Sequence, residues 1–160
     1  MILRLAICLL LTGCFQGRHL QTVTSLSSGN LDKTVRLLDS DHRYLRLSTL
    51  QHLNQQAWRN PPTSGDATVQ SVLARLEDNN EWCPIRGQAA LLIGQWQLVE
   101  HTEAIIHALE ACDDESRFWM LKGLEHLGEQ SSLAKGTIQV LSNDPDIFIR
   151  TEATAWLEAQ

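Results

Sequence analysis

The chain has 160 residues, of which 43% are hydrophobic and 20% are charged, and its formal net charge is -6 at pH 7. This length and composition are those of one globular domain with a buried core, and they exclude a wholly disordered chain. The basic residues are scattered among acidic ones, so the sequence also argues against a nucleic-acid partner.

The first 13 residues have the pattern of a secretory signal. Arg4 gives a positive start, and residues 5–11 form a continuous apolar run. That run suits the core of a signal peptide and is too short to span a bilayer, which takes about 20 residues. It leads into residues 11–14, Leu-Thr-Gly-Cys, which are an aliphatic residue, two small residues and a cysteine.

Residues 11–14 resemble the lipobox of bacterial lipoproteins. The resemblance implies that Cys14 is acylated on its sulfur with diacylglycerol, after which residues 1–13 are removed. Two or three acyl chains would then hold the protein stably to a membrane of the bacterial cell envelope. Phe15 stands where an aspartate is associated with inner-membrane retention in some bacteria, which favours the outer membrane facing the periplasm. An ordinary secretory signal with an incidental cysteine is the alternative.

Residues 14–30 begin with Cys14 and continue as a polar stretch rich in Ser, Thr and Gly. This composition predicts a flexible tether with a reach of about 20–25 Å. Leu20, Val23 and Leu26 recur at helical spacing, so the alternative is an extra helical turn that covers the start of the following domain.

Residues 31–160 are expected to form one helical domain, because apolar residues recur there with the three- and four-residue spacing of amphipathic helices. Asp66 and Thr102 are expected N-caps, Pro84 falls in a first helical turn, and Gly128 ends a helix. The expected helices are 31–39, 42–56, 67–77, 84 to about 98, 103–112, 116–127, 131–142 and 146–159.

A short phrase recurs in the second helix of each of the four resulting pairs. It has an arginine or methionine, then a small residue three positions later, within an apolar stretch. Single pairs cannot bury their apolar faces, so the pairs are expected to stack. The small residue is expected where neighbouring second helices cross closely. These small residues are Thr49, Ala89, Gly123 and Ala153.

The clearest copy, residues 144–153, begins Asp-Pro and continues with Ile-Arg and Ala. It resembles the HEAT repeat family in its short bacterial form. The resemblance covers residues 31–160 and implies an all-α fold, an α-solenoid of about four HEAT-like helix pairs. A compact helical bundle is the alternative, but it does not explain the recurring phrase.

The same resemblance implies a ladder of Asp and Arg side chains across the turns within the pairs. Met120 departs from the pattern at the third arginine. The members of the ladder would be Asp41 with Arg46, Asn80 with Arg86, Asp114, and Asp144 with Arg150.

No phosphate-binding loop, nucleophile elbow or pair of catalytic carboxylates occurs in the sequence, so we expect no enzyme activity and identify no small-molecule substrate. Glu103, His107 and the nearby His101 make half of a zinc site, which needs three or four ligands. A solvated helix face is the simpler interpretation, and no metal is expected. The acyl lipid on Cys14 is the one non-protein group that the sequence indicates.

Cys83 and Cys112 remain once the signal is removed and Cys14 is lipidated. An envelope compartment permits disulfides, and both residues lie near the same edge of the stacked pairs. A disulfide needs Cα atoms within about 7 Å, whereas neighbouring helices pack about 8–10 Å apart. The sequence leaves two buried free thiols and a disulfide as alternatives.

The second helices should present a strip of leucines, amides and charges, the mixture found in a non-obligate protein interface. We therefore expect a non-catalytic, membrane-anchored scaffold that binds another envelope protein. The leucines would otherwise widen the core. Two other functions stay open: an enzyme accessory, since some short HEAT-type proteins are similar to bilin-attaching lyases, and a structural or carbohydrate-associated envelope module. The expected contact residues are Leu47, Gln51, Gln88, Leu91, Leu121, Lys122, Glu125 and Glu152, with Trp58 in a loop.

The five tryptophans divide into two groups by their positions. Trp58 and Trp82 lie in or beside loops and are expected to make surface contacts. Trp96, Trp119 and Trp156 lie on apolar helical faces and are expected to pack in the core or at its rim.

Overall fold

The computed structural model describes residues 31–57, 62–113 and 115–159. Cys14, the 14–30 segment, Trp58 and Asp114 lie outside them. The described residues are helical and contain no strand, so the expected all-α class is confirmed. The elements in chain order are α2 (Leu31–Leu38), α3 (Arg43–Gln56), α4 (Ala67–Glu77), α5 (Cys83–Gln95), η2 (Val99–His101), α6 (Thr102–Ala111), α7 (Ser116–Leu127), η3 (Gly128–Ala134), α8 (Lys135–Leu141) and α9 (Ile147–Glu158).

The boundaries differ most from expectation at the end of α5 and before α8. α5 ends at Gln95, and the chain then turns through Gln97, whose φ is 59°. The helix expected over 131–142 begins as the 3-10 segment η3 directly after α7, and only its second half is α-helical. Gly128 makes this possible: its φ of 60° ends α7 without a loop, so no residues separate α7 from the next helical segment.

One of the two expected N-caps is confirmed, and the other shifts by one residue. Asp66 caps α4 as expected, and its carboxylate accepts from Thr68 N. Thr102 is instead the first residue of α6, and its Oγ1 donates to the carbonyl of Val99. At α9 the cap is Asp146, whose carboxylate accepts from the amides of Phe148 and Ile149.

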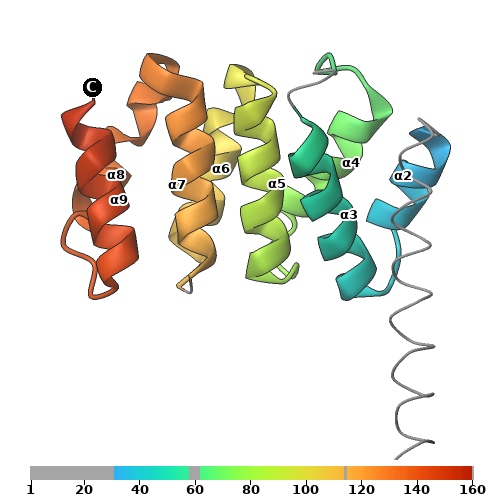
Figure 1. The fold of residues 1–160 in the computed structure, drawn as a ribbon, viewed down its shortest axis with the longest axis horizontal. Helices are drawn as coiled ribbons and strands as arrows, with labels where there is room; N and C mark the ends of the chain where they lie inside the picture. Colours follow the sequence, from blue (N-terminus) through green and yellow to red (C-terminus); the bar gives the residue numbers. More distant parts are fainter. Residues whose placement is uncertain (1–30, 58–61, 114, 160) are drawn as a thin grey trace, which may run out of the picture.

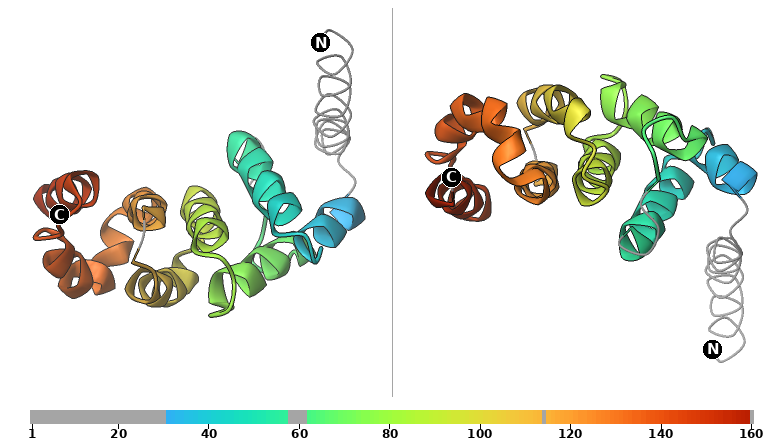
Figure 2. Two further views of the ribbon diagram at one scale, coloured as in Figure 1. Left: turned by 90° about the horizontal axis from the view of Figure 1, so that it is seen from below. Right: turned by 90° about the horizontal axis from the view of Figure 1, so that it is seen from above.

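The helices form two rows (Figures 1 and 2). α3, α5, α7 and α9 lie side by side in one row, and α2, α4, α6 and α8 lie behind them. The turns α2–α3, α4–α5, α6–α7 and α8–α9 all come to the lower edge of Figure 1. We call this edge, with the first turns of the four front helices, the turn edge.

The tightest contact in the front row is between α5 and α7, and glycines make it possible. A Cβ on Gly94 would lie 2.6 Å from the Cα of Gly123, and a Cβ on Gly123 would lie 2.5 Å from the carbonyl oxygen of Ala90. Any side chain there would push the two backbones apart. The close crossing expected from Gly123 is therefore present, with Ala90 and Gly94 rather than Ala89 as its partners.

The core lies between the two rows and is continuous from end to end. The expected small residues Thr49, Ala89 and Ala153 are all buried in it. Each fully buried leucine or isoleucine contributes roughly 1.5–3 kcal/mol. The largest fully buried aliphatic side chains of the core are Leu38, Leu50, Leu76, Ile85, Leu92, Ile93, Ile105, Leu109, Leu121 and Leu124. Among the described residues, no helix combines the length and apolarity that crossing a bilayer requires.

Candidate interaction surface

Arg46 links the first and second helix pairs across the turn edge. Its Nε and Nη2 donate to the two carboxylate oxygens of Glu81 at 2.7 Å, and its Nη1 donates to the carbonyl of Ser40. Glu81 is buried and also lies 3.6 Å from Nη1 of Arg75. A bidentate pair of this kind fixes orientation as well as adding energy. The arginine was correctly expected to bind at this edge, but its carboxylate partner comes from the next pair instead of Asp41.

Arg86 takes a different role from the one expected. It is buried, and its Nε donates to the carbonyl of Leu76 at 3.0 Å, at the end of the preceding helix. Burial lowers the pKa of the Arg86 guanidinium, and the carboxylate of Asp78 opposes that effect. Arg86 thus ties α5 to α4 within one pair and does not form a rung with Asn80.

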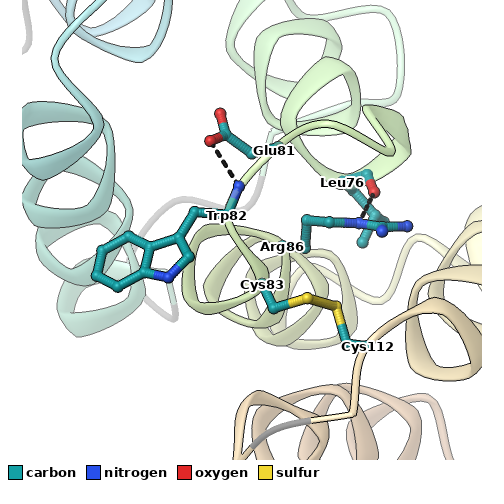
Figure 3. Close-up of a disulfide and its surroundings, with 6 residues drawn as sticks. All are labelled: Leu76, Glu81, Trp82, Cys83, Arg86 and Cys112. Atoms are coloured by element: carbon teal, nitrogen blue, oxygen red, sulfur yellow. Dashed lines mark hydrogen bonds between the residues drawn. A yellow bond between two sulfur atoms is a disulfide. The ribbon is translucent and has the colours of Figure 1, made fainter.

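A disulfide between Cys83 and Cys112 links the second pair to the third (Figure 3). The two Cα atoms are 5.9 Å apart, which is within the range that a disulfide spans. The distance between packed helices does not apply to this pair of cysteines, because Cys112 follows the last residue of α6 and so lies in the turn. Figure 3 also shows Trp82, next to Cys83, with its indole directed away from the disulfide and its amide bonded to Glu81.

Arg117 joins the third pair to the fourth. Its Nη1 lies 2.7 Å from the buried carboxylate of Asp144. Arg150, the expected partner of Asp144, donates instead to its main-chain carbonyl at 2.6 Å. Met120 stands where the recurring phrase has arginine in the other pairs. Arg117 lies one helical turn before Met120 on the same helix and makes the ion pair to the next helix pair instead.

These contacts brace the turn edge from end to end. An ion pair, a disulfide and a second ion pair connect consecutive helix pairs in turn. Because each link joins residues far apart in the sequence, the edge holds the front helices in fixed relative positions. Side chains on their first turns are therefore presented on a rigid support.

Of the eight helical residues in the predicted contact strip, three are buried and five are partly or fully exposed. Leu121 is fully buried, and Leu91 and Gln88 are buried as well. The two leucines widen the core because α5 and α7 approach so closely that this flank is closed. Leu47 is half-buried and packs on the core, whereas Gln51 is exposed.

The three charged members of the strip form a cluster of their own. Lys122 on α7 lies 2.7 Å from Glu125 and 2.5 Å from Glu152 on α9. Burial lowers the pKa of Lys122, but the hydrogen bonds to both carboxylates outweigh it, so the net shift is upward. The hydrogen bond from Lys122 lowers the pKa of Glu125. These groups join two front helices and are already paired with one another.

Exposed aromatic side chains lie instead on the turn edge, one group at the start of each front helix. Tyr44 is in the first turn of α3, Trp82 caps α5, Phe118 and Trp119 lie in the first turn of α7, and Phe148 lies in that of α9. We call these five residues the aromatic row. Tyr44, Trp82, Trp119 and Phe148 are exposed, Phe148 by 73%. Of the two places expected for Trp119, the core is excluded by its exposure and the rim remains, whereas Trp96 and Trp156 are buried as expected.

The aromatic row consists of two clusters. Tyr44 and Trp82 meet edge to face, with ring centroids 5.8 Å apart, and the guanidinium of Arg43 lies 5.7 and 5.4 Å from their centres. At the other end, the rings of Phe118 and Trp119 are 5.1 Å apart, and Phe148 faces the same groove. The sequence carried a signal for this row, because an aromatic residue recurs near the start of every second helix.

A groove of about 420 Å³ separates the start of α7 from the start of α9. Its lining residues are Glu115, Phe118, Trp119, Asp146, Phe148 and Ile149. The groove is wide enough to accept a side chain from another molecule.

Metal chemistry receives no support from the described residues, since no group of three or more His, Cys, Asp or Glu side chains is gathered there. His101, Glu103 and His107, which make half of a zinc site in the sequence, are not gathered into such a group. Comparison of the whole chain with protein-family models, with curated proteins and with solved structures finds no match.

Proposed function

We propose that this protein is a lipid-anchored, non-catalytic scaffold of the bacterial cell envelope. In this proposal residues 31–160 form a HEAT-like α-solenoid, and the aromatic row binds another envelope protein. The anchor is the acylated Cys14, and residues 14–30 are the tether between membrane and domain.

The solenoid part of the proposal is supported by the way the pairs stack. Consecutive pairs are joined along one edge by an ion pair, a disulfide and a second ion pair, and the recurring small residues are buried between them. A compact bundle would bury helices on several sides, whereas here the helices lie in two rows (Figure 2).

The envelope location is supported by two independent features. Residues 11–14 have the lipobox pattern, and the domain carries a disulfide between Cys83 and Cys112. Disulfides persist in oxidising compartments such as the periplasm and are rare in the cytosol. A secreted or anchored chain is the simplest explanation of both.

The observation that carries the binding function is the aromatic row itself. Aromatic side chains supply most of the energy in protein interfaces, and tryptophan and tyrosine are over-represented among the residues that matter most. Here four of them are exposed on an edge that is braced by two ion pairs and a disulfide. A rigid support lowers the entropic cost of binding.

Affinity capture from native membranes tests the proposal. The full-length acylated protein would be recovered with its neighbours after mild solubilisation, and the same would be done with the double variant Tyr44→Gln/Trp82→Gln. We expect one protein to be recovered in stoichiometric amount with the parent and to be lost with the variant.

The double variant Leu133→Gln/Val140→Gln is the matched control. It removes two exposed apolar side chains that lie outside the aromatic row and should leave capture unchanged. Equal capture by all three proteins, or no protein captured by the parent, would contradict the proposed function.

A further inference from the structure

The groove between α7 and α9 has an apolar floor and aromatic walls. Ile149 at its base is buried, while Trp119 is 41% exposed and Phe148 73% exposed. Both side chains line the groove and are exposed to solvent. The two helices lie next to each other in the front row (Figure 1).

The charged residues that line the groove are both acidic. They are Glu115 and Asp146. Neither forms a salt bridge with any cation of the described residues. The Oδ1 of Asp146 caps α9 by accepting from Phe148 N at 2.8 Å. Both carboxylates thus stand at the rim without a cationic partner from this part of the chain.

The other end of the aromatic row shows what such a site accepts. There the chain's own Arg43 lies over the Tyr44 and Trp82 rings, at 5.7 and 5.4 Å from their centres. A guanidinium over an aromatic face at this distance is attracted by the negative charge of the ring face. No cation of the described residues occupies the corresponding place over Trp119 or Phe148.

We propose that this groove binds an arginine side chain from the partner protein, placed between the rings of Trp119 and Phe148 and within reach of Glu115 and Asp146. The planar guanidinium fits the site because it stacks on rings and can donate to carboxylates from its edge at the same time. This inference rests on the proposed function and specifies the chemistry of the partner.

Fluorine NMR of the full-length acylated protein, labelled with 5-fluorotryptophan, tests it directly. The substitution Trp119→Phe identifies the resonance of Trp119. The probe is the peptide amide Gly-Gly-Arg-Gly-Gly, and matched peptides carry lysine or citrulline in place of arginine. Citrulline keeps the shape of arginine and removes its charge.

We expect the arginine peptide to shift the Trp119 resonance saturably, the lysine peptide to bind more weakly, and the citrulline peptide to cause no saturable shift. The variant Glu115→Gln/Asp146→Asn should weaken arginine binding by about tenfold, from the loss of two charge interactions that solvent partly screens. Asparagine is as good an N-cap as aspartate, so α9 keeps its start. Phe148→Leu should weaken binding severalfold through loss of the ring.

Three results would overturn the inference: an equal shift with citrulline, equal shifts of all tryptophan resonances, or no saturable shift with arginine. A shift caused by phosphatidylcholine bicelles but not by the arginine peptide would assign the groove to a lipid headgroup and would also overturn it. If capture of a protein still depends on Tyr44 and Trp82 while the arginine peptide fails, this inference alone is wrong. If the peptide binds and no protein is captured, the proposed function is the part that fails.

Discussion

Reduction of the disulfide between Cys83 and Cys112 should destabilise the domain substantially. The bond joins residues 29 apart in sequence, and closing a loop of that length in the unfolded chain corresponds to about 3.6 kcal/mol in the chain-entropy description. This is a large share of the roughly 5–15 kcal/mol by which domains are stable. For a domain of this size the melting temperature should fall by about 10–15 °C.

Urea unfolding followed by circular dichroism, with and without reductant, measures this difference on an unchanged sequence. Non-reducing mass spectrometry after alkylation should find Cys83 and Cys112 blocked before reduction and both alkylated afterwards. The variant Cys83→Ala/Cys112→Ala is the control, since its stability should not respond to reductant. If full reduction changes the free energy of unfolding by less than about 1 kcal/mol, the disulfide does not brace the turn edge as described.

Three further predictions concern the anchor, the close helix crossing and pH. Cys14→Ala should release the protein from membranes, because in the proposed function the acyl lipid on Cys14 supplies the membrane anchor; a variant that still resists an alkaline wash would disprove the lipid assignment. Gly94→Val should destabilise the domain by at least 3 kcal/mol, in the range of severe overpacking, because the valine side chain would collide with the Gly123 backbone. Gly136→Ala is the control: Gly136 has open space around it, so this variant should keep the melting temperature of the parent. The lowered pKa of Glu125 means that its contribution to stability is present above its unfolded pKa and is lost as pH falls through the folded value. Because Glu125 is about half exposed, that contribution should be below about 1 kcal/mol, and Glu125→Gln should remove it from a pH series of melting temperatures.

The helices were predictable because their apolar spacing, caps and breaks agree with one another. Asp66 begins α4 and Gly128 ends α7 as the sequence indicates. The small residues also correctly predicted a close crossing of neighbouring front helices, although Gly123 meets Gly94 and Ala90 there instead of Ala89. These features depend on neighbours in the sequence, which a pattern can capture.

Features that depend on distant residues were predicted less well. The partners of Arg46 and Asp144 come from adjacent pairs, whereas the family resemblance implied Asp41 and Arg150. Leu91 and Leu121 appeared to face outward by helical phase, yet the glycine-mediated approach of α5 and α7 closes that flank. Trp119 was expected in the core or at its rim because its phase was judged from one helix, whereas its exposure depends on the edge on which it lies.

Site-specific photo-crosslinking in intact cells tests the binding account most directly. A benzoylphenylalanine would replace Phe148, Tyr44 or, as a control, Val140, each of them exposed, in the full-length acylated protein. We predict that positions 148 and 44 give an adduct with the same envelope protein and that position 140 gives none. An adduct at position 140 alone, or none at either position of the aromatic row, would contradict the account.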